Sequence, residues 1–311
     1  MENKKLLRAN LVLSSLVLLF LFTSFLKVDV SRTVSSYLTK RTDSLSQIVH
    51  SLDLSKDYFL AGEFIPIHIQ EVRERLDREL VENSYRHSRT ILNIKKANKY
   101  FPIIEPILAE EGVPDDMKYL AIAESDLMNA TSSAGAKGIW QFMKATGREY
   151  GMQVNDEVDE RYHIEKATRA AARYLKSKKE KLGTWAFAMA AYNAGTTGVK
   201  NAIAKQKAQS YFDLNMSQET TRYYFRIAAI KEIMQHPERY GFYLDDSELY
   251  PPMTDFNIVT VDTTIENLGD FANKYGISYR ILKVYNPWLR RHKLTNTSGK
   301  EYEIKIPKIT F

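Results

Sequence analysis

The stretch "DDMKYLAIAESDL", residues 115–127, places a carboxylate where an apolar residue is expected. Met117, Leu120 and Ala121 follow one another at the spacing of a buried helix face, and the next position of that face is Glu124. Burial, together with the negative end of the helix dipole, favours the protonated form of a carboxyl. The sequence therefore predicts an acid near neutral pH, the kind of group that protonates a glycosidic oxygen.

Two further segments have residues suited to surround such an acid. In "TWAFAMAAYNAG", Tyr192 ends an apolar helical stripe with a hydroxyl group. In "SSAGAKGIWQ", Gly135 and Gly138 allow the backbone to approach a ligand, and Gln141 offers a donor and an acceptor to a sugar. The residues alone also allow structural explanations: a glutamate paired with an arginine, a core tyrosine and an ordinary loop.

Helices are predicted to position these residues. Two amphipathic helices occupy "IHIQEVRERLDRELVENSYRHS" and "TILNIKKANKYFPIIEPILAEEG". After the helix of the candidate acid and a loop, another helix is predicted to begin near Gly138, with "IWQFMKATGREYG". Further on, one helix is predicted to end at Gly183, the next to be capped by Thr184, and a third to run from a Ser217 cap to Pro237.

A change of pattern after residue 250 predicts a second domain. "YPPMTD", residues 250–255, has the composition of a linker. Beyond it the pattern is short strand, helix, helix, short strand, over about 55 residues. This length and order indicate a compact binding module.

Composition limits the possible classes of protein. The chain has 311 residues, of which 44% are apolar and 26% charged, as in soluble globular proteins of about two domains. It has no cysteine, which excludes disulfides, thiolate metal sites and thiol catalysis. The net charge of +6 is mild and scattered. No zinc-ligand set or basic heptad region supports nucleic-acid binding.

The N-terminus resembles an export signal. Lys4, Lys5 and Arg8 precede an uncharged apolar run over residues 11–26. The run is at the short end for a membrane span, and no small-x-small cleavage site follows it. We therefore expect residues 1–30 to be an uncleaved signal anchor, with a cleaved signal as the alternative.

Five blocks of sequence together resemble the catalytic domain of the family 1 lytic transglycosylases, and most closely the membrane-bound lytic murein transglycosylase D subgroup. In order, they are "AESDL", "SSAGAKGIWQFMKATGREYG", "DERYHIEKATRAAARYL", "WAFAMAAYNAG" and "ETTRYYFRI". The resemblance covers roughly residues 85–240. It implies a helical, lysozyme-like fold that cleaves the β-1,4 bond between N-acetylmuramic acid and N-acetylglucosamine in peptidoglycan, with Glu124 as the sole catalytic acid and base.

The resemblance also implies substrate-binding residues around Glu124. Tyr192 is implied to lie closest to the catalytic carboxyl, and the "DERY" block, with Asp159 or Arg161, is interpreted as structural. No metal or cofactor is expected. The implied substrate-binding residues are Ser133, Gln141, Met143, Tyr192, Asn193, Glu219 and Tyr223.

The C-terminal module resembles a LysM domain, a small fold that binds glycans containing N-acetylglucosamine. "FANKYGISYRILKVYNPWL" and "YEIKIP" carry the likeness, whereas "IENL" lacks the glycine usual in the first loop. If the module binds glycan, its deletion should weaken retention on sacculi and leave the chemistry at Glu124 intact.

The sequence as a whole predicts four parts. They are a signal anchor (1–30), a stem (31–60), a lytic transglycosylase domain with an N-terminal helical extension (61–245) and a LysM-like domain (255–308).

The function expected from this resemblance is non-hydrolytic cleavage that leaves 1,6-anhydromuramic acid ends. One alternative is a muramidase on the same fold, which needs a second carboxylate facing Glu124; Asp126 and Asp156 are the candidates in sequence. Another is a non-catalytic peptidoglycan-binding scaffold. The expected partners are peptidoglycan glycan strands and a membrane, with the catalytic domain in the cell envelope outside the cytoplasm, in the periplasm; protein partners are left open.

Overall fold

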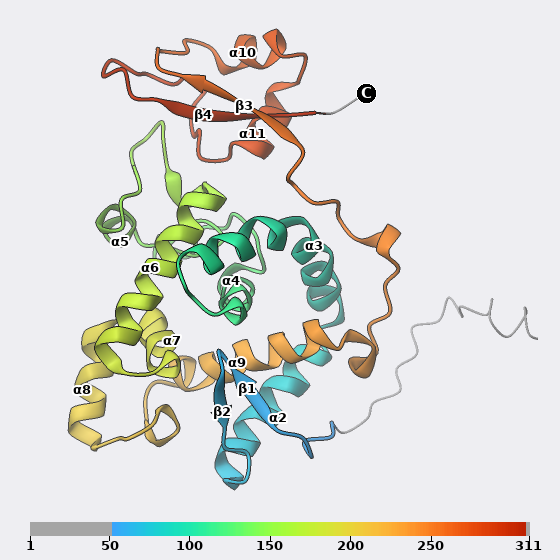
Figure 1. Cartoon of the computed structure of the whole chain (residues 1–311), viewed down its shortest axis with the longest axis vertical. Helices are drawn as coiled ribbons and strands as arrows, with labels where there is room; N and C mark the ends of the chain where they lie inside the picture. The colour runs from blue at the N-terminus through green and yellow to red at the C-terminus, as the bar shows by residue number, and fades with distance from the viewer. Residues whose placement is uncertain (1–51, 309–311) are drawn as a thin grey trace, which may run out of the picture. The chain divides into compact units, whose positions relative to one another are not determined.

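The computed structural model of the chain describes residues 52–308. The predicted anchor and most of the predicted stem lie outside this part. Among the described residues, no helix is both long and apolar enough to cross a membrane. The prediction of a mainly α protein with a small α+β module at its end is confirmed (Figure 1).

Helices make up most of the described part up to residue 250. Short 3₁₀ turns link several of them, including η1 (Asp115–Met117) and η2 (Glu160–Tyr162). The α-helices of this part are α2 (Gln70–Ser84), α3 (His87–Glu110), α4 (Lys118–Ser125), α5 (Lys144–Glu149), α6 (Ile164–Leu182), α7 (Trp185–Ala194), α8 (Thr196–Gln206) and α9 (Gln218–Gln235).

Most of these helices end where the sequence predicts. Gly183 follows α6 with a φ of 94°, a conformation that glycine adopts without strain. The Thr184 hydroxyl accepts a hydrogen bond from the Phe187 amide at the start of α7, and Ser217 does the same for Thr220 at the start of α9. Helix α8, directly after Gly195, is an element that the sequence analysis did not predict.

The prediction that a helix begins near Gly138 is wrong, because helix α5 begins only at Lys144. The backbone amide of Lys137 donates to the Phe142 carbonyl and the Phe142 amide donates to the Lys137 carbonyl, which closes a turn between them. Within this turn Gly138 has a φ of 82° and Gln141 a φ of 50°, both outside the range of a right-handed helix.

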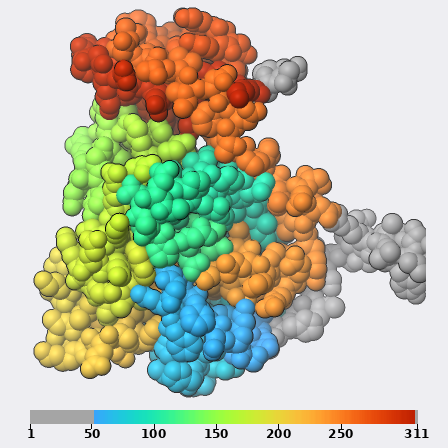
Figure 2. Space-filling model, in the orientation of Figure 1, coloured from blue at the N-terminus to red at the C-terminus, as the bar shows by residue number. Residues whose placement is uncertain are grey.

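The folded domain begins before residue 61, the boundary predicted from the sequence. Strands β1 (Tyr58–Leu60) and β2 (Glu63–Ile65) form an antiparallel hairpin, in which Tyr58 lies opposite Ile65. Leu54, Tyr58 and Leu60 are buried in the main core. Figure 2 shows the blue atoms of this N-terminal region against the orange atoms of α9. Residues 54–60 therefore belong to the domain and not to a stem.

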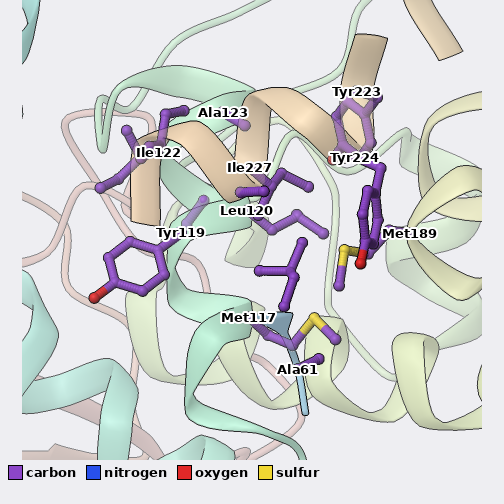
Figure 3. Packing of buried hydrophobic residues seen from close by; sticks show 14 of the residues in the cluster. Ala61, Met117, Tyr119, Leu120, Ile122, Ala123, Met189, Tyr223, Tyr224 and Ile227 are labelled. Atoms are coloured by element: carbon purple, nitrogen blue, oxygen red, sulfur yellow. The ribbon is translucent and has the colours of Figure 1, made fainter. Parts of the chain in front are cut away.

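Helix α4 lies in the middle of the main core. Met117, just before α4, and Leu120 within it are fully buried, and Figure 3 shows them beside Ile227 of α9. Met189 of α7 and Tyr224 of α9 lie at the same cluster. The helix that carries Glu124 is thus held on its apolar face by two longer helices.

The C-terminal module has the predicted order of strand, helix, helix and strand. Strands β3 (Phe256–Val261) and β4 (Tyr302–Pro307) pair antiparallel, and the helices are α10 (Leu268–Lys274) and α11 (Tyr279–Tyr285). Leu268, Leu282 and Ile304 of the module belong to a buried cluster that is separate from the main core.

Replacing Leu60 by alanine should test whether the hairpin belongs to the folded domain. Leu60 is 0% exposed, so Leu60→Ala should lower the free energy of unfolding by about 2–5 kcal/mol. Phe59, the neighbouring residue, is 49% exposed, and Phe59→Ala should cost less than about 1 kcal/mol. Chemical denaturation of both variants measures the difference. Equal small losses would mean that the hairpin is a dispensable part of the stem.

Candidate active site

Glu124 occupies the last turn of α4, next to the point where the chain leaves the helix. Asp126 ends the helix in the left-handed conformation, with a φ of 54°. Glu124 is partly exposed, whereas its neighbours Ala123 and Ser125 are buried. The Tyr223 hydroxyl of α9 donates a hydrogen bond to the Glu124 Oε1 atom. The carboxyl thus receives a hydrogen bond from a different helix, α9.

The surroundings of Glu124 raise its pKa to about 7. Burial is the main cause, because it disfavours the charged form, and the negative charge of Glu219 acts in the same direction. The hydrogen bond from Tyr223 and the positive charge of Arg226 lower the pKa but do not offset burial. At neutral pH a large fraction of Glu124 carries a proton and the rest is a carboxylate.

Two phenol groups remain neutral beside this carboxyl. Burial and the charge of Glu124 raise the pKa values of Tyr223 and Tyr192 well above their usual range. The Tyr192 hydroxyl donates to the Trp140 carbonyl oxygen at 2.7 Å. The resemblance implies that Tyr192 lies closest to the acid, but the phenol that bonds the Glu124 carboxyl is that of Tyr223.

Loop 129–143 carries three of the predicted substrate-binding residues. Ser133 is exposed within a tight turn. Met143 is 45% exposed and precedes the first residue of α5. The Gln141 side-chain nitrogen donates to the Gly138 carbonyl at 2.7 Å and to the Ala130 carbonyl at 3.3 Å, so its donor group is used within the loop. The structure thus brings Ser133, Gln141 and Met143 onto one loop.

Helices α4 and α6 hold the middle of this loop. The Ser125 hydroxyl, next to Glu124, donates to the Ile139 carbonyl at 2.7 Å. Trp140 is fully buried, and its indole nitrogen donates to the Thr168 hydroxyl of α6 at 2.9 Å. These contacts fix the loop directly to the helix that bears the acid.

Arg161 bonds the loop at two points. Its guanidinium pairs with the Asp159 carboxylate at 2.8 and 2.7 Å and donates to the Gly135 and Phe142 carbonyls. The "DERY" block is thus structural, in agreement with the sequence interpretation. A side chain at Gly138 would meet the Arg161 carbonyl oxygen at 1.9 Å. This glycine therefore allows the Arg161 backbone to come close, whereas the sequence analysis expected it to allow a ligand to come close.

Two more predicted residues lie at or bond to the start of α9. Glu219 is exposed and forms a two-pronged ion pair with Arg226, at 2.9 and 3.3 Å, which lowers the pKa of Glu219. The Asn193 side-chain oxygen accepts a hydrogen bond from the Thr220 hydroxyl at 2.8 Å. Asn193 therefore joins the end of α7 to the start of α9, which supports the position of Tyr223.

The two candidates for a second carboxylate have other partners. The Asp126 carboxylate accepts hydrogen bonds from Arg89 at 2.5 Å and Asn93 at 2.9 Å. The Asp156 side chain is 92% exposed and lies 4.0 Å from Arg291 of the C-terminal module. Across residues 52–308, no group of three or more His, Asp or Glu side chains is arranged to hold a metal ion.

Three residues contribute to the site without having been assigned a role from the sequence. They are Ser125, which binds the loop, Trp140, whose carbonyl accepts from Tyr192, and Arg226, whose charge opposes the effect of burial on Glu124. Arg226 follows Tyr223 by three residues, so helical spacing places both on one face of α9. Once Tyr223 is a candidate site residue, this spacing could identify Arg226 from the sequence.

Comparisons with known protein families match both parts of the chain. Residues 101–215 match the Transglycosylase SLT domain, and residues 257–310 match the Soluble lytic transglycosylase C-terminal LysM-like domain. The two matches confirm the resemblances inferred from the sequence. The predicted combination of a lysozyme-like helical domain with a small LysM-like domain is confirmed with them.

Individual relatives cover the chain to different extents. Membrane-bound lytic murein transglycosylase D of Escherichia coli (strain K12) is 30% identical over 243 residues, which is 76% of this chain and 52% of the relative. The chain thus spans about half the length of that relative. A putative tributyltin chloride resistance protein of Alteromonas sp. (strain M-1) is 28% identical over 120 residues, 38% of this chain and 58% of that protein. The solved structure of an inactive mutant of lytic transglycosylase Slt from Pseudomonas aeruginosa has a TM-score of 0.39 and 20% identity, over 50% of this chain and 27% of that one.

Replacing Glu124 by glutamine should change how stability depends on pH. The folded pKa of about 7 is above the usual value of 4.5, so the wild-type protein loses stability as pH rises from about 4.5 to about 7. The glutamine side chain has no proton to lose. Glu124→Gln should therefore match the wild type below pH 4.5 and be more stable by up to roughly 3 kcal/mol above pH 7.

Denaturation of both proteins at pH 4 and pH 8 measures this difference. Glu219→Gln is the control, because the pKa of Glu219 is shifted in the opposite direction, downward, and its charge is paired with Arg226. That variant should show no gain in stability at pH 8. An advantage of Glu124→Gln that is the same at both pH values would show that Glu124 does not titrate in this window.

Proposed function

We propose that this chain, whose helical part contains a transglycosylase SLT domain, is a peptidoglycan lytic transglycosylase. It would cleave the β-1,4 bond between N-acetylmuramic acid and N-acetylglucosamine without water and leave 1,6-anhydromuramic acid ends. The observation that carries the proposal is the Glu124 carboxyl, with a pKa of about 7 and a hydrogen bond from Tyr223. A catalyst with a pKa near the working pH serves best when one group must both give and take a proton.

In the first step Glu124 acts as an acid. Its proton passes to the bridging oxygen of the glycosidic bond, the bond from muramic acid C1 to that oxygen breaks, and positive charge develops on the sugar. The carboxylate that remains is stabilised by the Tyr223 hydroxyl and by the nearby charge of Arg226. These two groups stabilise the charged form of Glu124, the form that the first step produces.

In the second step the same carboxylate acts as a base. It takes the proton of the muramic acid C6 hydroxyl, whose oxygen forms a bond to C1 and closes the anhydro ring. Glu124 is protonated again, and no water is consumed. Because the nucleophile belongs to the substrate, this route needs only one carboxyl group.

The remaining predicted residues would orient the glycan. The exposed Ser133 and Met143 and the amide oxygen of Gln141 all lie on loop 129–143, which is held to Glu124 through Ser125. Glu219, exposed at the start of α9, offers a further acceptor for sugar hydroxyls. Holding the substrate in the reactive geometry accounts for a large part of the rate of such enzymes.

The hydrolytic alternative is less well supported by the contacts of its candidate residues. Glycosidases that use water or a protein nucleophile need a second carboxyl group about 5–9.5 Å from the acid. Asp126 is paired with Arg89, and Asp156 is exposed near Arg291. A non-catalytic scaffold would have no use for a carboxyl with a pKa of about 7.

The cell envelope is the proposed location, with residues 1–30 as a membrane anchor. This rests on the apolar run over residues 11–26 and on the name of the Escherichia coli relative, which describes that protein as membrane-bound. The LysM-like match supports glycan binding by the C-terminal module. Mature protein that begins between residues 27 and 36 would show a cleaved signal instead.

Digestion of purified sacculi tests the reaction type. The wild-type protein should release muropeptides whose reducing ends are lighter by one water than those of a hydrolase, as measured by mass spectrometry. Glu124→Gln keeps the shape of the side chain but cannot transfer the proton, so the rate should fall by at least about 10²–10⁴-fold.

Asp126→Asn and Asp156→Asn are the matched controls, since each removes one carboxylate and keeps its shape. Both should retain most of the activity and yield the same anhydro ends. Hydrolysed ends together with an inactive Asp126→Asn or Asp156→Asn variant would establish a muramidase. Absence of digestion by the wild type would leave the scaffold as the better proposal.

Replacing Tyr223 by phenylalanine tests the hydrogen bond to Glu124. That bond lowers the pKa of Glu124, so its removal should raise the pKa. The activity of the wild type should decline as pH rises through about 7, and in Tyr223→Phe this decline should move to higher pH. Tyr192→Phe is the control, because its hydroxyl donates to the Trp140 carbonyl. A decline that moves equally in both variants would contradict a specific role of Tyr223.

A further inference from the structure

Residues 153–165, here called the bridging segment, lie between loop 129–143 and the C-terminal module. The Asp159 amide donates to the Trp288 carbonyl at 2.9 Å, and the Arg290 amide donates to the Glu157 carbonyl at 2.7 Å. These bonds flank an antiparallel bridge between Val158 and Leu289. The bridging segment therefore pairs with the module as a short piece of sheet does.

Side chains of the bridging segment complete the core of the module. Val158 is 1% exposed and Tyr162 is 4% exposed, and both belong to the same buried cluster as Trp288 and Leu289. The Arg290 guanidinium lies 4.2 Å from the centre of the Tyr162 ring. Without the bridging segment, this side of the module's core would face water, which disfavours a free module.

Polar contacts surround this shared core. The Thr295 amide donates to the Glu157 carboxylate at 2.7 Å, and Lys305 of β4 forms an ion pair with Glu165. Burial opposes ionisation of Glu165, but hydrogen bonding from His163 and the charge of Lys305 lower its pKa to about 2. The ion pair and the bond from Thr295 lie beside the apolar core and fix how the module sits on the bridging segment.

The linker is also attached to the helical domain. Met253 is 5% exposed and packs against Ile103 and Ile107 of α3. Its backbone amide donates to the Lys99 carbonyl at 3.1 Å. The segment predicted to be a linker thus has a buried side chain and a fixed hydrogen bond.

On its other side, the bridging segment supports loop 129–143. Arg161, fixed by Asp159, donates to the carbonyl oxygens of Gly135 and Phe142, which lie on either side of Gly138 in the chain. Tyr162 belongs to the core of the module and also bonds the Thr131 hydroxyl at 3.0 Å. A continuous path of contacts therefore runs from the module to the loop that carries Ser133.

We propose that the C-terminal module is a positioning element of the active site, which holds loop 129–143 in place through the bridging segment. This inference rests on the proposed function, because it assigns the loop a role in turnover. Undocking the module lowers turnover even of a glycan too short to reach it. The sequence suggested the opposite, that the chemistry at Glu124 is independent of residues 255–308.

The test compares two full-length variants, in each of which an aspartate replaces a β-branched apolar residue. Val158→Asp puts a charge into the shared core, whereas Ile258→Asp changes a residue that is 54% exposed on β3. In Val158→Asp, amide hydrogen exchange over residues 135–142 should accelerate at least about tenfold, and kcat on a soluble tetrasaccharide of peptidoglycan should fall about 10–100-fold. Ile258→Asp should leave both quantities at the wild-type level.

Two milder variants keep the test decisive if Val158→Asp does not fold. Arg290→Ala removes the contact with the Tyr162 ring and should accelerate exchange in the loop about two- to fivefold. Val158→Ile keeps the site apolar and should retain wild-type exchange and kcat. Wild-type loop exchange and kcat in Arg290→Ala would overturn the inference.

The exchange measurement separates this inference from the proposed function. A wild-type protein that does not cleave the tetrasaccharide or sacculi would contradict the proposed function, whereas loop exchange would still report whether the module supports the loop. A variant that loses only retention on sacculi, with unchanged loop exchange and kcat, would show that the module acts in glycan binding alone.

Discussion

The organisation of the helical domain follows from the need to keep one carboxyl protonated at neutral pH without leaving it unpartnered. Burial raises the pKa of Glu124 to about 7, and the Tyr223 hydroxyl limits the rise while giving the carboxyl a donor. A fully apolar site would raise the pKa further and remove the base that the second step of the proposed reaction requires. A strongly positive site would lower the pKa and leave Glu124 without its proton. The packing of α4 against α7 and α9 sets the balance between these limits.

Near this carboxyl, loop 129–143 is held by hydrogen bonds to its own backbone carbonyl groups. Ser125, Tyr192 and Arg161 reach the loop from three different elements, and each donates to a carbonyl oxygen of residues 135–142. Contacts of this kind hold the path of the chain and leave the side chains of Ser133 and Met143 exposed. The loop can therefore be rigid and still present its side chains to a ligand.

Local sequence patterns predicted most of the helices, because caps and glycines at helix ends act within a few residues. They failed at Gly138, where the backbone conformation is decided by Arg161, which lies far along the sequence. They also missed the hairpin of β1 and β2, since strands of three residues give no clear alternation. The bond between Tyr223 and Glu124 joins positions 99 residues apart, so the resemblance named both residues but the fold was needed to pair them.

The core shared by residues 153–165 and the C-terminal module also bears on how the gene can change. Domain boundaries drawn along a sequence suggest that a recombination event in the linker exchanges one module for another. Here the cut would remove Trp288 and Leu289 from a cluster completed by Val158 and Tyr162. A replacement module would have to offer a complementary apolar face to the bridging segment, so the two parts are expected to be inherited and to unfold as a single cooperative unit.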